Sequence, residues 1–172
     1  MIKMLGACMI LAGCFGLGLW YQGQFSGRIR ALRMLSYILE LLAGEVRYGR
    51  STLPECCQHI VTYLEEPFSE AFGRIGRRME ENVGLSFGEI FAEETEPILE
   101  SLPIRQSDKE VFRRFALQTG FADGQMQLRT LEQCRDMLQQ TEEKLEKENA
   151  EKCRMAVGLG AMSGLLLLLV LW

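Results

Sequence analysis

The chain has 172 residues, of which 48% are hydrophobic and 24% are charged, and its formal net charge is −4. This balance gives no bulk field that would attract nucleic acid, and no basic stripe is interleaved with aromatic residues, so we expect no nucleic-acid partner. The charges are unevenly placed, because residues 4–27 and 155–172 contain no Lys, Arg, Asp or Glu. The sequence therefore predicts one polar domain between two apolar ends.

The N-terminal apolar run contains Leu11-Ala12-Gly13-Cys14, which is similar to the cleavage site of a bacterial lipoprotein. Only Lys3 precedes the run, whereas a signal peptide needs a basic start. The run also stays apolar after Cys14, as far as Tyr21. We therefore predict an uncut transmembrane helix over residues 4–24. A lipoprotein-like extracytoplasmic binding module is the alternative, and processing at Cys14 stays open.

Hydrophobic residues in the middle recur at steps of three and four, which predicts helices throughout and no sheet. The first helix runs from Ile29 to Val46 and ends at Gly49, and the second runs to Leu64 before Pro67. The third covers residues 68–79 and is followed by Gly84, the fourth is broken by Pro97 and Pro103, and the fifth reaches Thr119. The sixth follows a turn at Gly120 and Asp123-Gly124 and continues toward residue 155.

Three capping boxes mark the predicted helix starts, at Thr52-x-x-Glu55, Ser86-x-x-Glu89 and Ser107-x-x-Glu110. In such a box the hydroxyl accepts from a free backbone N–H, and the carboxylate accepts from the N–H of the capping residue. Each box precedes a periodic segment, so the three together favour a six-helix bundle.

The C-terminal run, residues 155–172, would be about 27 Å long as a helix, close to the roughly 30 Å hydrocarbon core of a bilayer. Basic residues flank the inner ends of both runs: Arg28, Arg30 and Arg33 after the first, and Lys144, Lys147, Lys152 and Arg154 before the second. The positive-inside rule then places residues 28–154 in the cytoplasm of a two-pass membrane protein.

The inventory of reactive residues is small, so we expect neither an enzyme, nor a cofactor, nor a metal site. His59 is the only histidine, no C-x-x-C pair joins the six cysteines, and no phosphate-binding loop occurs. We expect the cysteines to be small buried hydrophobic residues, and any further role of Cys56 and Cys57 stays open. Glu93, Glu94, Glu96 and Glu100 are expected to be a solvated helix face.

Two segments, "AGEVRYGRSTLPE" (43–55) and "LQTGFADGQMQLRTL" (117–131), resemble the stage III sporulation protein AB family of spore-forming bacteria. The similarity extends over essentially the whole chain, although Thr119-Gly120 stands where the family usually has Leu-Gly. That family resembles the platform protein of type II secretion and type IV pilus machines. The resemblance implies a role in the channel between mother cell and forespore, and a place in the outer forespore membrane.

The implied partners are the secretion-type ATPase of the same operon, other channel membrane proteins and the lipid bilayer. Whether the chain forms homo-oligomers, which surface docks the ATPase and what the channel transports stay open. The candidate site residues make turns or contact a partner, and they are Glu45, Tyr48, Gly49, Pro54, Glu55, Gly120, Asp123 and Gln127.

Overall fold

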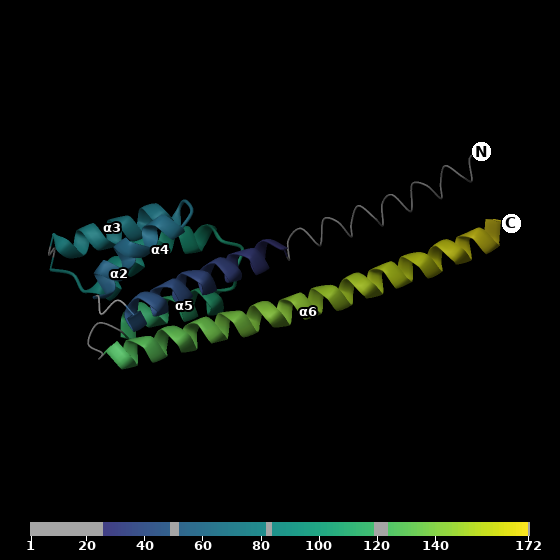
Figure 1. The fold of residues 1–172 in the computed structure, drawn as a ribbon. Helices are drawn as coiled ribbons and strands as arrows, with labels where there is room; N and C mark the ends of the chain where they lie inside the picture. Colours follow the sequence, from purple (N-terminus) through teal and green to yellow (C-terminus); the bar gives the residue numbers. More distant parts are fainter. Residues whose placement is uncertain (1–25, 49–51, 82–83, 119–123, 172) are drawn as a thin grey trace. The chain divides into compact units, whose positions relative to one another are not determined.

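The computed structural model describes residues 26–48, 52–81, 84–118 and 124–171, with side chains throughout except at positions 118, 153 and 156–171. Six α-helices and one 3-10 helix make up these ranges, and they contain no strand, so the all-α prediction is confirmed for them. After the helix over residues 26–48 come α2 (Leu53–Ile60), η1 (Val61–Tyr63), α3 (Phe68–Glu80), α4 (Phe87–Ser101), α5 (Gln106–Gln118) and α6 (Gly124–Leu171) (Figure 1).

The chain divides into two compact units. One unit is Arg30–Glu142, and the other combines Met1–Ile29 with Glu143–Trp172. The predicted span over residues 4–24 lies outside the described residues, and so do the side chains of the second span beyond Met155, although α6 is helical to Leu171. Among the described residues, no helix combines the length and apolarity that crossing a membrane requires.

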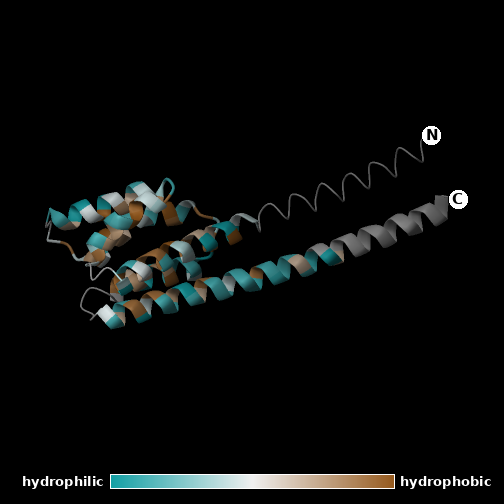
Figure 2. Cartoon of the chain, in the orientation of Figure 1, coloured by the Kyte–Doolittle hydropathy of each residue, from teal (hydrophilic) through white to brown (hydrophobic). Residues whose placement is uncertain are grey.

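The first helix buries one face, as its spacing predicts. Leu32, Leu35, Leu39 and Leu42 are all fully buried, whereas Arg33 and Glu40 between them are exposed. Figure 2 shows the same separation along the other helices of this unit, with hydrophobic and hydrophilic positions on different sides. Burial of such a face, rather than local propensity, provides most of the stability of a helix of this kind.

A cluster of six phenylalanines joins α3, α4 and α5. Phe91 lies at its centre, and its ring centroid is 4.9 Å from that of Phe115, 5.6 Å from that of Phe112 and 5.8 Å from those of Phe72 and Phe87. Phe68 completes the cluster against Phe72 and Phe112. Tilted and edge-to-face ring pairs at these distances add to the apolar burial, so this cluster fixes how the three helices pack.

Two helix starts follow the predicted capping boxes. The backbone N–H of Thr52 donates to Glu55 at 2.8 Å at the start of α2, and that of Ser86 donates to Glu89 at 2.8 Å at the start of α4. The backbone hydrogen bond from Thr52 lowers the pKa of Glu55. The hydroxyl of Ser86, which donates to Glu89 at 2.7 Å, and the backbone N–H of Ser86 lower the pKa of Glu89.

The third predicted box, Ser107 to Glu110, is wrong. Helix α5 already begins at Gln106, and the carboxylate of Asp108 accepts from the backbone N–H of Arg105 at 3.1 Å. Asp108, rather than Glu110, provides the capping carboxylate because it is three residues after Arg105, the spacing at which a carboxylate reaches back to the N–H of the cap residue. Ser107 is therefore inside the helix.

The predicted break at Pro97 is also wrong, because α4 continues through it to Ser101. Proline cannot donate to the carbonyl four residues earlier, which here belongs to Glu93. Both residues are exposed, so water can replace the missing donor. The helix instead ends just before Leu102 and Pro103.

Candidate functional site

The first group of candidate residues lies where the helix over residues 26–48 ends and α2 begins. Glu45 is half-buried, and its Oε2 lies 2.9 Å from Nδ1 of His59 on α2, so this pair links the two helices. Tyr48 is 82% exposed. Pro54 occupies the first turn of α2, where a missing N–H costs nothing, and Glu55 caps that turn. Glu45, Pro54 and Glu55 thus have structural roles, and Tyr48 presents its ring to solvent.

Of the second group, only Gln127 is described, and it is half-buried near the start of α6. Gly120 and Asp123 lie outside the described residues, and so does Gly49 of the first group. The described members of the two groups lie at the same end of Arg30–Glu142, because Arg47 forms an ion pair with Glu132, which is about 1.4 turns beyond Gln127 on α6. Figure 1 shows this end, where the 26–48 helix and α5 finish and α6 begins.

Three large apolar side chains are exposed at this end. Tyr48 is the last described residue of its helix, Leu117 in the last turn of α5 is 68% exposed, and Met126 in the first turn of α6 is 64% exposed. We call these three residues the apolar tip. Large exposed apolar side chains at one end of a domain are candidates for protein–protein contact, and Tyr and Met are enriched in such interfaces.

Of the four acidic residues of α4 that we expected to be solvated, Glu93 and Glu100 are exposed, and Glu94 departs most from the prediction. Glu94 is only 13% exposed and accepts from Arg74 at 2.6 Å and from Arg78 at 2.7 Å. Arg78 also donates to Glu93 at 2.7 Å. Burial disfavours the charge of Glu94, but the hydrogen bonds from the two arginines outweigh it, and the pKa of Glu94 is lowered. These side chains therefore join α3 to α4.

The remaining two acidic residues of α4, Glu96 and Glu100, differ in their surroundings. Glu96 forms an ion pair with Arg113 of α5, and Glu100 is exposed.

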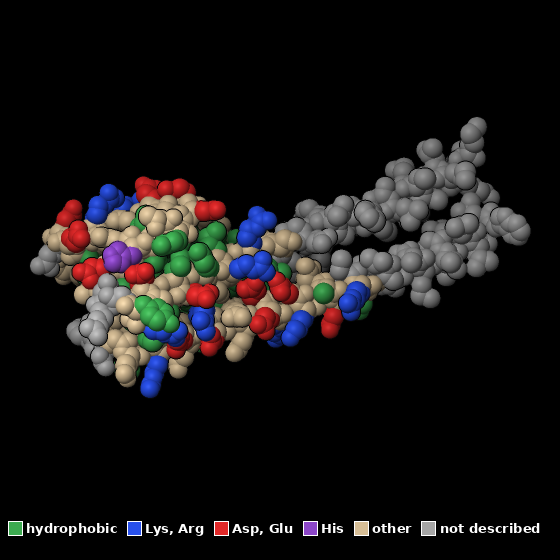
Figure 3. Space-filling view, in the orientation of Figure 1, with side chains coloured by type: hydrophobic (Ala, Val, Ile, Leu, Met, Phe, Trp, Pro, Cys, Tyr) green, Lys and Arg blue, Asp and Glu red, His purple; other side chains and the backbone are tan. Residues whose placement is uncertain are grey.

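Within the described ranges, no group of three or more His, Cys, Asp or Glu residues could hold a metal ion. On the face shown in Figure 3, acidic, basic and hydrophobic side chains are interleaved.

The described cysteine side chains are thiols rather than disulfides, and they are buried, as expected for small hydrophobic residues. Cys56 and Cys57 are fully buried in α2, and Cys134 is 2% exposed in α6. Burial raises the pKa of Cys56 to about 11, and it also raises the pKa of Cys57 and of Cys134. These thiols are therefore poor nucleophiles in the folded protein.

The family model described as stage III sporulation protein AB matches residues 3–172. The chain belongs to this family. A curated relative, "Stage III sporulation protein AB" of Bacillus subtilis (strain 168), is 26% identical over 171 residues, which cover 99% of each chain. A solved structure of "Stage III sporulation protein AB (SpoIIIAB)" has a TM-score of 0.62 and 22% identity, and the match covers 72% of this chain and 97% of that chain. The family is thus implicated in sporulation, and the structural match shows that its helical fold is shared.

Sequence reasoning singled out Tyr48 but missed the other two residues of the apolar tip. In both cases the position of the residue relative to the buried face of its helix could have identified it. Leu117 does not belong to the buried face made by residues 111, 112, 115 and 116 of α5. Met126 precedes the buried face of α6 that includes Leu131. An apolar residue away from the buried face of its helix is a candidate for contact with a partner.

Proposed function

We propose that this chain is a non-enzymatic membrane platform in a secretion-like channel complex between mother cell and forespore, and that it docks the secretion-type ATPase of its own operon. Residues 4–24 and 155–172 are then transmembrane helices in the outer forespore membrane. Residues 28–154 form a bundle in the mother-cell cytoplasm, of the kind found in secretion platform proteins. Membership of the sporulation family, the helical fold and the basic residues inside both apolar runs support this proposal.

The observation that carries the docking role is the apolar tip. Tyr48, Leu117 and Met126 come from three helices, and Tyr48 and Met126 lie at the helix ends that are farthest in sequence from the apolar runs. The ion pair between Arg47 and Glu132 links the helix end that carries Tyr48 to the start of α6, near Met126.

The test is a pull-down of the operon's ATPase by the full chain in detergent, with Tyr48→Ala and Met126→Ala as tip variants. Truncating an interface hot spot costs about 2 kcal/mol, so we expect each variant to weaken binding by roughly thirtyfold. Tyr37→Ala is the matched control, because Tyr37 is an exposed tyrosine of the same helix, at 45% exposure. Undiminished capture of the ATPase by both tip variants would exclude the tip as its docking site.

A further inference from the structure

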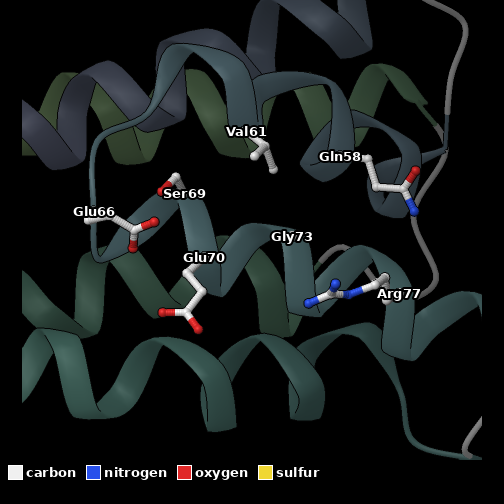
Figure 4. Close-up of a pocket in the computed structure, with 7 residues that line it drawn as sticks. All are labelled: Gln58, Val61, Glu66, Ser69, Glu70, Gly73 and Arg77. Carbon is white, nitrogen blue, oxygen red and sulfur yellow. The ribbon is translucent and has the colours of Figure 1, made fainter.

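An open groove of about 410 Å³ lies between α2–η1 and α3, within Arg30–Glu142. Figure 4 shows Glu66 and Ser69 at one end of this groove and Gln58 and Arg77 at the other. Between the two ends, Val61 of η1 faces Gly73 of α3. We call this feature the α3 groove. It uses none of the residues of the apolar tip.

Glycine occurs twice in the middle of α3, and the surroundings of the two differ. A Cβ at Gly76 would clash with Cγ of Gln58, so Gly76 leaves room for the Gln58 side chain. A Cβ at Gly73 would meet only Cγ2 of Val61, at 3.9 Å, which is an ordinary contact. Glycine inside a helix costs about 1 kcal/mol relative to alanine. Gly73 thus lowers the stability of α3, and the missing side chain keeps the floor of the α3 groove open.

The α3 groove is lined by the acidic Glu66 at one end and by the basic Arg77 at the other, where Gln58 also donates to Glu80 at 2.8 Å. Glu66 and Arg77 are both exposed, and neither forms an ion pair with another side chain in the described ranges. Glu70 adds to the acidic end, although it also contacts Arg74 at 2.9 Å. Helix α3 rises about 10 Å from Glu70 to Arg77, and about 15 Å from Pro67 beside Glu66. An extended peptide covers these lengths in about three to five residues.

We propose that the α3 groove binds an extended segment of a partner protein. This segment carries a Lys or Arg for Glu66 and Glu70 and, three to five residues away, an Asp or Glu for Arg77. A small apolar side chain between them lies over Gly73 and against Val61. The charges fix the direction of the segment, and the glycine floor sets the size of the central side chain. The proposal is independent of ATPase docking at the apolar tip.

The test is selection from a phage-displayed library of random dodecapeptides on the full chain in detergent, with counter-selection on Gly73→Leu. We expect enriched sequences that combine a basic and an acidic residue three to five positions apart. The enriched peptide, measured by fluorescence anisotropy, should lose binding to Gly73→Leu and bind Glu66→Lys and Arg77→Glu about tenfold more weakly. Tyr48→Ala should leave its affinity unchanged, which separates this groove from the tip.

Gly44→Ala is the control for the glycine substitution, because Gly44 is also helical and a Cβ there would meet nothing within 4 Å. If Gly73→Leu does not fold by circular dichroism, Gly73→Ala replaces it, and we then expect a partial loss of binding. Peptides that bind wild-type and Gly73 variants equally would overturn the proposal. Enriched sequences without the charge pair, or with charges seven residues apart as on a helix, would overturn it as well.

Discussion

Gly88, the second residue of α4, lies against the backbone of α5. A Cβ at this position would lie 3.0 Å from the carbonyl oxygen of Ala116 and 3.4 Å from Cα of Leu117. Both atoms belong to the backbone of α5, so no side chain can rotate away and the two helices must move apart. Their separation would also disturb the ring contacts between Phe91 and Phe115. Gly88→Ala therefore tests whether the helices pack as closely as the structure shows.

The expected change in the free energy of unfolding follows from two opposing terms. Overpacking in a well-packed interior costs about 1–3 kcal/mol. The higher helix propensity of alanine returns at most about 1 kcal/mol, and less in the first turn of a helix. We therefore expect Gly88→Ala to destabilise the protein by about 1–2 kcal/mol, which lowers Tm by roughly 2–8 °C in a chain of this size.

The assay is thermal unfolding of the full chain in detergent, followed by far-ultraviolet circular dichroism. Gly44→Ala is the matched variant, because the same substitution there meets open space and should raise the stability by up to about 1 kcal/mol. The two variants thus have opposite predicted signs. A rise in Tm for Gly88→Ala similar to that for Gly44→Ala would refute the close packing of α4 against α5.

Two further predictions concern titratable groups. The folded pKa of Glu94 lies below its ordinary value of 4.5, so the stability that this carboxylate contributes is present above pH 4.5 and is lost as the pH falls through the folded pKa. Glu94→Gln should therefore lower Tm at pH 7 and flatten its fall below pH 4.5, and Glu100→Gln, an exposed change on the same helix, should do neither. The buried thiols of Cys56, Cys57 and Cys134 should react with a maleimide far more slowly in the folded chain than in urea. Equal rates in the two states would show that the fold does not bury them.

The sequence predicted the fold best where a helix or a helix start depends only on residues close together in the chain. Apolar spacing located the first helix and α6, and the boxes at Thr52 and Ser86 located two helix starts. It failed at Ser107 and Pro97, where the outcome depends on which carboxylate reaches the cap and on whether a carbonyl faces water. Whether a capping box forms depends on which nearby carboxylate binds the N–H of the cap, and whether a proline breaks a helix depends on solvent access to the unpaired carbonyl. The sequence pattern shows neither.

The candidate site was only partly predictable for a different reason. The contact between Glu45 and His59 and the ion pair between Arg47 and Glu132 join residues that are 14 and 85 positions apart. Periodicity within one helix contains no information about such pairs. The pairing of Glu93 and Glu94 with arginines of α3 is of the same kind, and it makes Glu94, which we expected to be solvated, part of a link between helices.

The most direct test of a cytoplasmic platform held by two apolar ends is the accessibility of an exposed residue from outside the cell. Tyr48→Cys suits this purpose, because Tyr48 is 82% exposed, whereas the described native cysteines are buried and would label poorly on either side. The account predicts that a membrane-impermeant maleimide labels Tyr48→Cys above the wild-type background only after the cells are permeabilised. Labelling of Tyr48→Cys in intact cells would contradict it, and would favour the extracytoplasmic binding module instead.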